Sequence, residues 1–386
     1  MEGYLVFINV ENSILHIDQE SKILSNGKEF DGKGASENAG GSYGGSGGGN
    51  LIYDYPYYVY GSPNQLFDKN NVEVNLEYAG SGGAVYTNND GGGTIAIYAK
   101  TLKLEGSIQA NGDPPVDYTT RNSISGGSGG YIYLNITDQM KNKIFAKNAS
   151  IQSNGGKGYG NSGSGSGGRI VISGITFEEE YMNYISASGG DLFDNRDKSL
   201  HLYGAAGTIY FEKSTTLIIN NHMQNYTGDG GESQITPISP DTKESISLII
   251  ATNNSTITIE NKTDDSSVEF QDLQMSNGSC FVEPYKTLES KKQYRINGTN
   301  LTLNTSSRIH FGINTEKYIL WLEGSFFVDQ YSNIFYSTSI EIYANSNITF
   351  EEQLDFSTNQ LSNNLNLNVK FSSNRSLFIG ENVEIR

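Results

Sequence analysis

Blocks of glycine and serine that run directly into β-like segments recur through the first half of the chain, and they constrain the fold more than any other feature. Four such segments align without gaps: "GGGTIAIYA" (91–99), "SGGYIYLNI" (128–136), "SGGRIVISG" (166–174) and "AAGTIYFEK" (205–213). The Gly-turn residues that directly precede the strands are spaced by 37, 38 and 39 residues and are Gly93, Gly130, Gly168 and Gly207. A repeat period of about 20 to 50 residues predicts a stacked repeat architecture.

A second recurring element lies within the same period. An isoleucine, a small polar residue and a turn follow one another in "SIQANGD" (107–113), "SIQSNGG" (150–156) and "YISASGG" (184–190), with "KILSNGK" (22–28) as an earlier copy. Each repeat therefore reads as a Gly block, a strand, a polar bend, a second strand and an Asn-Gly turn. Because glycine allows positive φ and close backbone approach, we expect the blocks to stack as loops that project from one corner, beside strands whose side chains alternate in and out. The alternative is that the blocks are disordered loops.

The second half of the chain repeats at a shorter period. Apolar residues two apart follow Asn, Gly or Ser, and their first positions, at steps of 21 to 29 residues, are Ile257, Cys280, Leu301, Phe326, Ile348 and Leu377. This alternation is typical of the strands of a β-solenoid. Cys280 is the only cysteine, which excludes an intrachain disulfide, and its inward position predicts a small buried hydrophobe.

The two periods together predict an all-β fold, a parallel β-helix (β-solenoid) with Gly-rich loops between its rungs. We divide the chain into Gly-rich β-helix repeats (1–220), a connecting segment (221–245) and further rungs without Gly blocks (246–386). Helical patterns are confined to 136–147 and 177–184, where a turn or two of helix would decorate a bend between two strands.

The aligned segments also carry a family resemblance. Residues 91–97, 128–134 and 166–172, together with the Asn-Gly turns at Asn111 and Asn154, resemble the right-handed parallel β-helix proteins of the pectin-lyase-like type. More narrowly, they look like the Gly-rich repeats of large predicted surface or secreted proteins of ciliates. The resemblance covers roughly residues 20–215. It implies a right-handed β-helix and a structural or adhesive role, and it implies little about activity.

Charge and hydropathy narrow the partners and the compartment. The net charge is −17, so the surface repels phosphate backbones and disfavours nucleic acid, and it disfavours anionic polysaccharides unless a divalent cation bridges the two. No apolar run approaches the length of a transmembrane helix, and the start "MEGYLVFINVENS" is not a signal peptide. We expect an intracellular protein or, preferably, a piece of a longer extracellular or cell-surface chain, because the end "SLFIGENVEIR" reads as another rung.

Asn-X-Ser/Thr sequons are frequent and are candidate N-glycosylation acceptors if the protein is secreted. They are Asn135, Asn148, Asn225, Asn253, Asn254, Asn261, Asn277, Asn297, Asn300, Asn304, Asn347 and Asn374. Two interpretations compete. The sequons form a stripe of glycans along one corner of the solenoid, or asparagine serves there as a turn residue that tolerates left-handed backbone and forms side-chain ladders.

Candidate chemistry is sparse. Carboxylates stand beside flexible backbone in "NNDGGG" (88–93), "GGDLFDNRD" (189–197) and "GDGGES" (228–233). These segments either bind calcium or are acidic loops in contact with solvent. Apart from calcium, we expect no cofactor. For an enzyme, the best catalytic cluster that the sequence offers is Asp191, Asp194, Arg196 and Asp197. A solvated loop is the simpler interpretation of the same residues, so the sequence leans away from an enzyme.

Exposed tyrosine is the remaining feature that favours a partner. "YDYPYYVYG" (53–61) is a candidate sugar-stacking or interface segment, with a cap or edge of the fold as the alternative.

The sequence favours a non-enzymatic structural or adhesive module that contacts carbohydrate or other surface proteins. The alternative function is a polysaccharide-active lyase or hydrolase, or a carbohydrate-binding module. Open solenoid ends would also allow self-association.

Overall fold

The computed structural model divides into two compact units, Met1–Pro237 and Ile238–Arg386, which we describe separately. The described residues are 5–27, 40–45, 47, 66, 79–83, 90–113, 123–138, 145–146, 148–160, 162–192, 202–221, 235–238, 246–259, 267–282, 294–311, 317–329, 332–336, 339–351, 355–358, 369–373, 375–379 and 384–385. They form an all-β structure with long parallel sheets. Within these ranges the helical element is the 3-10 helix η2 (Glu179–Asn183), inside the segment for which the sequence predicts a short helix.

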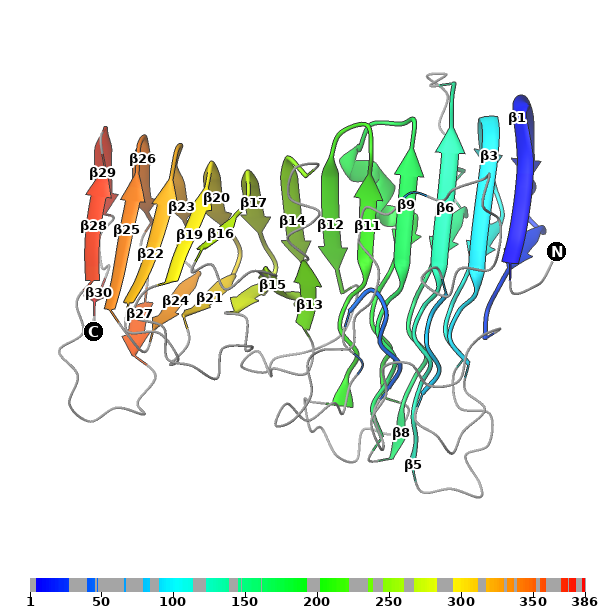
Figure 1. The fold of residues 1–386 in the computed structure, drawn as a ribbon, viewed down its shortest axis with the longest axis horizontal. Helices are drawn as coiled ribbons and strands as arrows, with labels where there is room; N and C mark the ends of the chain where they lie inside the picture. The colour runs from blue at the N-terminus through cyan, green and yellow to red at the C-terminus, as the bar shows by residue number, and fades with distance from the viewer. Residues whose placement is uncertain are drawn as a thin grey trace. The chain divides into compact units, whose positions relative to one another are not determined.

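The long strands of the first unit pair side by side (Figure 1). They follow the order β1 (Leu5–Ile17), β3 (Thr94–Leu104), β6 (Tyr131–Ile136), β9 (Arg169–Ser173) and β11 (Thr208–Phe211), and all of these pairs are parallel. β12 (Thr216–Asn220) then runs antiparallel to β11. The register aligns Thr94, Tyr131, Arg169 and Thr208. The four Gly-turn residues that precede them are therefore equivalent, which confirms the gapless alignment.

The strands of this sheet are buried on both faces. Residues 94–99 are buried without a break, and so are 131–134, 169–173 and 208–211. Parallel sheets that are covered on both faces have such continuous buried runs. The side chains that point out of the coil are therefore buried as well in these segments.

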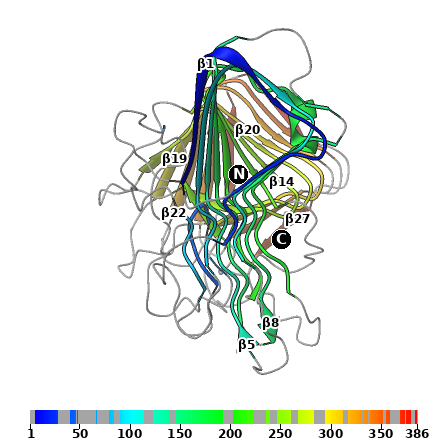
Figure 2. The same cartoon turned by 90° about the vertical axis from the view of Figure 1, so that its right-hand side faces the viewer.

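The second recurring element forms a second parallel sheet. Its strands are short and pair in the order β2 (Lys22–Leu24), β4 (Ser107–Gln109), β7 (Ser150–Gln152) and β10 (Ile185–Ser186). Ile23, Ile108, Ile151 and Ile185 share one register position, which confirms "KILSNGK" as a copy of this element. A small antiparallel pair, β5 (Ser123–Ile124) and β8 (Tyr159–Gly160), lies farther from the sheets (Figure 2).

The Gly blocks are ordered and hydrogen-bonded to one another. We call the residues 40–45, 79–83, 90–93, 110–113, 125–130, 153–156, 162–168, 187–190 and 204–207 the glycine bundle, and Figure 2 shows such extended segments running side by side away from the sheets. The backbone N–H groups of Ser128, Gly129 and Gly130 donate to the carbonyls of Ser81, Ser166 and Ala110 at 2.9, 2.9 and 2.7 Å. Three consecutive residues thus donate to three different segments.

The next block repeats this arrangement. Ser166, Gly167 and Gly168 donate to the carbonyls of Gly41, Ala205 and Ser153 at 2.9, 2.9 and 2.7 Å. A period of three residues is that of polyproline II, about three residues per turn, whereas the period of a β-strand is two. The bundle is therefore a lattice of extended three-fold segments, and these run side by side away from the sheets, in line with the expectation of stacked loops that project (Figure 2).

Glycine is required in the bundle because the segments approach closely. A Cβ on Gly129 would lie 2.2 Å from the Ser153 carbonyl oxygen, and a Cβ on Gly167 would lie 2.0 Å from that of Ala187. Among the described glycines, positive φ occurs at Gly27, Gly160, Gly174 and Gly278, all outside the bundle. The close approach of neighbouring segments therefore explains why the described positions of the bundle require glycine. The expectation that these glycines adopt positive φ is wrong.

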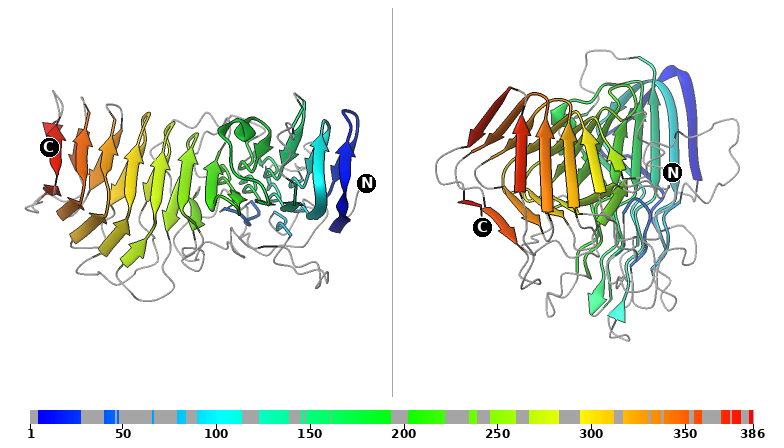
Figure 3. Two further views of the ribbon diagram at one scale, coloured as in Figure 1. Left: turned by 90° about the horizontal axis from the view of Figure 1, so that it is seen from above. Right: turned by 60° about the vertical axis from the view of Figure 1, so that its left-hand side comes forward.

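The second unit consists of three sets of parallel strands, and the chain visits the sets in turn, as the yellow-to-red strands in Figure 3 show. The first set is β14 (Leu248–Thr252), β17 (Asp272–Met275), β20 (Asn300–Leu303), β23 (Phe326–Val328), β26 (Asn347–Phe350) and β29 (Ser376–Ile379). The second set is β15 (Thr256–Ile259), β18 (Cys280–Val282), β21 (Arg308–Phe311), β24 (Asn333–Tyr336), β27 (Asp355–Thr358) and β30 (Glu384–Ile385). The third set is β16 (Ser267–Glu269), β19 (Tyr294–Gly298), β22 (Lys317–Leu322), β25 (Ser339–Ala344) and β28 (Val369–Ser373). β13 (Ile235–Ile238) contains the boundary between the two units.

The inward positions of this unit correct part of the sequence alignment. Leu301, Phe326, Ile348 and Leu377 share one register position, as expected. Ile257 and Cys280 belong to the second set, and the position equivalent to Leu301 in the preceding strand is Leu273. The error arose because the turns before both sets are rich in Asn, Gly and Ser, so the two corners look alike in sequence.

Candidate binding surface

The outward-facing side chains of the third set of the second unit gather aromatic and charged groups. On β22, Tyr318, Leu320 and Leu322 point into the core, and the intervening Trp321 is 36% exposed. Trp321 lies opposite Asn297 on β19 and Tyr343 on β25. The strand period of two residues therefore places this tryptophan on the outer face of the sheet.

Four of these side chains stack across neighbouring strands, and we call them the aromatic strip. The guanidinium carbon of Arg295 lies 5.2 Å from the centre of the Trp321 ring, and the Trp321 and Tyr343 rings are 5.2 Å apart with 32° between their planes. Lys370 Nζ lies 5.2 Å from the centre of the Tyr343 ring. A cation thus lies at each end of the ring pair, Arg295 at the Trp321 ring and Lys370 beside the hydroxyl end of Tyr343. The strip presents parts of both rings and two cations to solvent.

Polar contacts fix the strip in place. Arg295 Nε donates to Asn297 Oδ1 at 2.8 Å, and the Tyr343 hydroxyl donates to Glu341 Oε2 at 2.8 Å. Lys370 Nζ donates to the Tyr343 hydroxyl oxygen at 3.2 Å. The first two bonds join residues two apart on the same strand, and the bond between Lys370 and Tyr343 joins β28 to β25, so the strip is held both along and across the strands.

A carboxylate beside the strip is held ionised by its neighbours. Lys317 Nζ lies 2.9 Å from Glu341 Oε1. The hydrogen bond from Lys317, and then the one from Tyr343, lower the pKa of Glu341 below its ordinary value. The hydrogen bond to Tyr343 raises the pKa of Lys370. Two cations, Lys317 and Lys370, therefore act on this carboxylate, and Arg295 lies two strands away in the same register column.

The catalytic cluster of the sequence analysis is only partly within the described residues. Asp191 lies at the end of a bundle segment, where its Oδ1 accepts the N–H of Leu192 at 2.8 Å and its carbonyl accepts the N–H of Gly158 at 2.9 Å. Asp194, Arg196 and Asp197 lie outside the described residues, as does the tyrosine stretch 53–61. No group of three or more His, Cys, Asp or Glu side chains that could hold a metal ion occurs in the described part of the chain.

Several sequon asparagines serve as turn residues. Asn253, Asn254 and Asn277 have φ of 53°, 59° and 51°, in the left-handed region that asparagine tolerates. Asn277 Nδ2 donates to Asn253 Oδ1 at 3.3 Å, and Asn300 Nδ2 donates to Asp272 Oδ1 at 2.9 Å. These contacts support turn chemistry and side-chain ladders at these positions, and glycosylation stays a prediction.

The other sequons differ in their surroundings. Asn148 and Asn347 are exposed, whereas Asn135, Asn297 and Asn304 are partly covered. Asn135 Nδ2 donates to the Tyr133 hydroxyl oxygen at 3.4 Å. Asn225, Asn261 and Asn374 lie outside the described residues.

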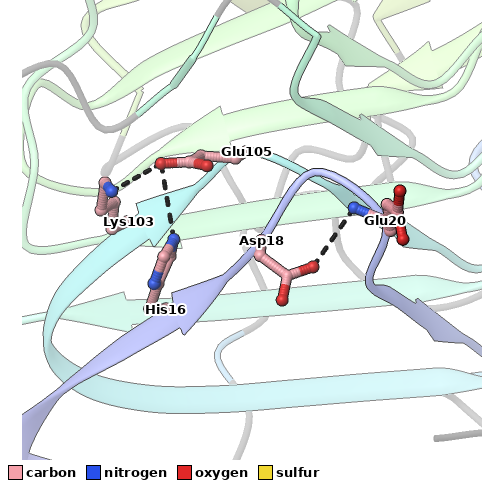
Figure 4. A network of polar contacts seen from close by, with 5 residues as sticks. All are labelled: His16, Asp18, Glu20, Lys103 and Glu105. Carbon is pink, nitrogen blue, oxygen red and sulfur yellow. Dashed lines mark hydrogen bonds and ion pairs between the residues drawn. The ribbon is translucent and has the colours of Figure 1, made fainter.

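Two further reactive groups have ordinary structural surroundings. Cys280 is 4% exposed, and burial raises the pKa of its thiol to about 12, so it is the buried hydrophobe that the sequence predicted. On the surface of the first unit, Glu105 Oε1 lies 3.4 Å from His16 Nε2 and 2.5 Å from Lys103 Nζ (Figure 4). The hydrogen bond from Lys103 lowers the pKa of Glu105, and Asp18 forms a separate contact with the N–H of Glu20 at 3.2 Å.

The aromatic strip escaped the sequence analysis, although a signal for it was present. "KYILWLEG" alternates apolar residues inward and leaves the only tryptophan of the chain at an outward position.

None of the helices within the described ranges is long and apolar enough to span a membrane. A scan against protein-family models and searches of curated proteins and solved structures found no match to this chain.

Proposed function

We propose that this chain is a non-enzymatic structural or adhesive module whose two units are built as a right-handed parallel β-helix. The parallel pairing of strands from successive repeats supports this architecture, because a chain that visits parallel sheets in turn winds around a common core. The right hand follows from the strong preference of parallel crossover connections. The Gly-rich repeats fit the resemblance to large surface proteins, so we place the module in a longer chain at a cell surface or in a matrix.

The glycine bundle is the observation that carries the structural role. Its backbone groups bond in three directions, as at Ser128, Gly129 and Gly130, so each segment is fixed by several others. Side chains satisfy further backbone groups of the bundle. Asn221 Oδ1 accepts the N–H of Gly189 at 3.0 Å, and Thr236 Oγ1 donates to the Ala206 carbonyl at 2.5 Å. A lattice with most of its polar backbone satisfied internally is stiff, which suits a scaffold.

The aromatic strip favours a second candidate, a carbohydrate-binding module. Tryptophan and tyrosine combine an apolar ring with a polar handle, and they are enriched where a surface meets a partner. Trp321 and Tyr343 stand among the hydrogen-bonding groups of Asn297, Glu341 and Lys370. The two rings pack against each other, so only parts of them are open to a sugar, and we rank this candidate second.

Two measurements on the same protein test the proposal. Amide hydrogen exchange of peptides that cover 125–130 and 162–168 should be as slow as that of β6 and β9, because both exchange only when the first unit unfolds. Fast exchange of the bundle would contradict the scaffold.

Incubation with neutral and acidic polysaccharides, with and without calcium, should leave the polymers uncut. Cleavage of any polymer would replace the structural role with an enzymatic one.

A further inference from the structure

The outward register positions of the third set hold more cations than carboxylates, although the chain as a whole carries 43 acidic and 26 basic residues. Arg295, Lys317 and Lys370 share these positions with two carboxylates, Glu269 and Glu341. Arg295 and Lys370 stand at the two ends of the ring stack, three strand spacings apart, which is about 14 Å. An acidic surface with an apolar component would complement this face.

The first unit displays such an acidic surface at η2, which we call the acidic knob. Glu178, Glu179 and Glu180 are consecutive and exposed, and the helix has no basic residue in its last turn. Tyr181 anchors the knob, since its ring lies 5.3 Å from that of Phe145 and 6.1 Å from that of Phe211. The backbone that carries the carboxylates is therefore held on a packed support and loses little freedom when a cation approaches.

We propose that the aromatic strip of one copy of this chain binds the acidic knob of a second copy. Arg295 and Lys370 pair with carboxylates of the knob, and the edges of Trp321 and Tyr343 contact the apolar stems between them. The two surfaces are different, so each copy offers one of each, and contacts between copies build a closed dimer, a ring or an open-ended assembly. The inference rests on the structural role proposed above, for which it names the partner.

The contact depends on exposed charges, which fixes how it responds to conditions. Association should appear at micromolar to millimolar concentration and weaken as added salt screens the pairs. Sedimentation velocity across a concentration series, at low salt and at about 0.5 M salt, measures both effects. A chain that remains monomeric at every concentration and salt overturns the proposal, whereas the exchange and cleavage experiments above test the structural role separately.

Charge reversal identifies the two surfaces. The knob variant carries Glu178→Lys and Glu180→Lys, the strip variant carries Arg295→Glu and Lys370→Glu, and the swapped variant carries all four changes. The first two should associate at least about tenfold more weakly than the native chain, and the swapped variant should recover association. The control is Lys22→Glu with Lys100→Glu, two exposed lysines of the first unit, which should associate as the native chain does.

Circular dichroism and thermal unfolding check that each variant is folded. If the strip variant fails to fold, the knob variant and the milder Lys370→Gln still test the proposed contact. The knob variant should fold because the carboxylates that it replaces are exposed. Loss of association in the lysine control to the same degree would show a general charge effect and overturn the assignment. Native-like association of the knob variant would do so too.

Discussion

The backbone N–H of Asn154 donates to Oδ1 of Asn111 at 2.8 Å. The same bond joins the repeat before, where the N–H of Asn111 donates to Asn26 Oδ1 at 2.7 Å. The ladder ends one repeat later, where the N–H of Ser188 donates to Asn154 Oδ1 at 2.9 Å. Each asparagine therefore supplies the acceptor for the equivalent residue of the next repeat, at the point where the short strands pass into the glycine bundle.

Replacing one asparagine of this ladder should destabilise the first unit. Asn111→Ala leaves the partly buried N–H of Asn154 without its acceptor, which costs about 1–3 kcal/mol. Urea unfolding of the variant should show that loss, and Asn148→Ala, at an exposed asparagine, should change stability by less than about 0.5 kcal/mol. Equal stability of the two variants would mean that the ladder contributes nothing.

A matched pair of substitutions tests close approach in the glycine bundle. The register places Gly129, Gly167 and Ala206 at equivalent positions of successive blocks. Gly167→Ala would put a Cβ 2.0 Å from the Ala187 carbonyl oxygen, so we expect a loss of about 3 kcal/mol or more, or failure to fold.

Ala206 already carries a Cβ, so its position accommodates the methyl group that Gly167 lacks. Ala206→Gly should therefore cost only about 0.5–1 kcal/mol, from the added freedom of the unfolded chain. Thermal unfolding of both variants measures the difference. A Gly167→Ala variant as stable as Ala206→Gly would contradict the lattice.

The single thiol should react only when the second unit opens. Burial raises the pKa of Cys280 to about 12, so almost no thiolate exists at pH 8 in the folded protein. Ellman's reagent should label the native protein at the slow rate of unfolding and the guanidinium-unfolded protein at once. Rapid labelling without denaturant would show that the core around Cys280 is open.

Stability of the second unit should depend on the ionisation of Glu341. Its folded pKa is lowered, chiefly by the hydrogen bond from Lys317, so its contribution is present above the ordinary value near 4.5 and is lost as pH falls through the folded pKa. Glu341→Gln should therefore lower the unfolding temperature slightly at pH 7 and give a flatter dependence below about pH 4.5.

The effect is small because the pair is partly exposed, and salt should reduce it further. Glu323→Gln, at an exposed carboxylate in the same unit, is the control for the loss of one negative charge. Parallel pH profiles of the native chain and Glu341→Gln would show that Lys317 does not stabilise the folded carboxylate.

Much of the repeat geometry was readable from the chain. The constant position of glycine before each strand gave the correct register at Gly93, Gly130, Gly168 and Gly207, because parallel strands of equivalent repeats pair at equivalent residues. The isoleucines at 108 and 151 gave the second sheet in the same way. The alignment failed at Ile257 and Cys280, since two different corners of the second unit use the same turn residues.

The candidate surface depended on information that a linear pattern does not hold. Trp321 was predictable as an outward residue, but its neighbours Arg295 and Lys370 come from strands far along the chain. Only the register of parallel pairing brings these side chains into one stack. The acidic cluster at 191–197, by contrast, was found because its residues are close together in the sequence. Its one described member, Asp191, makes hydrogen bonds to backbone groups.

The sequence by itself determined that this protein is all-β, that its first half repeats with glycine at fixed positions, and that Cys280 is buried. These properties follow from local alternation and from which residues tolerate close packing. The tertiary structure decided that the Gly blocks form a lattice and that four distant side chains form the aromatic strip. The reason is that a backbone N–H reveals nothing in sequence about the direction in which it bonds, and that direction is set only when neighbouring segments are in place.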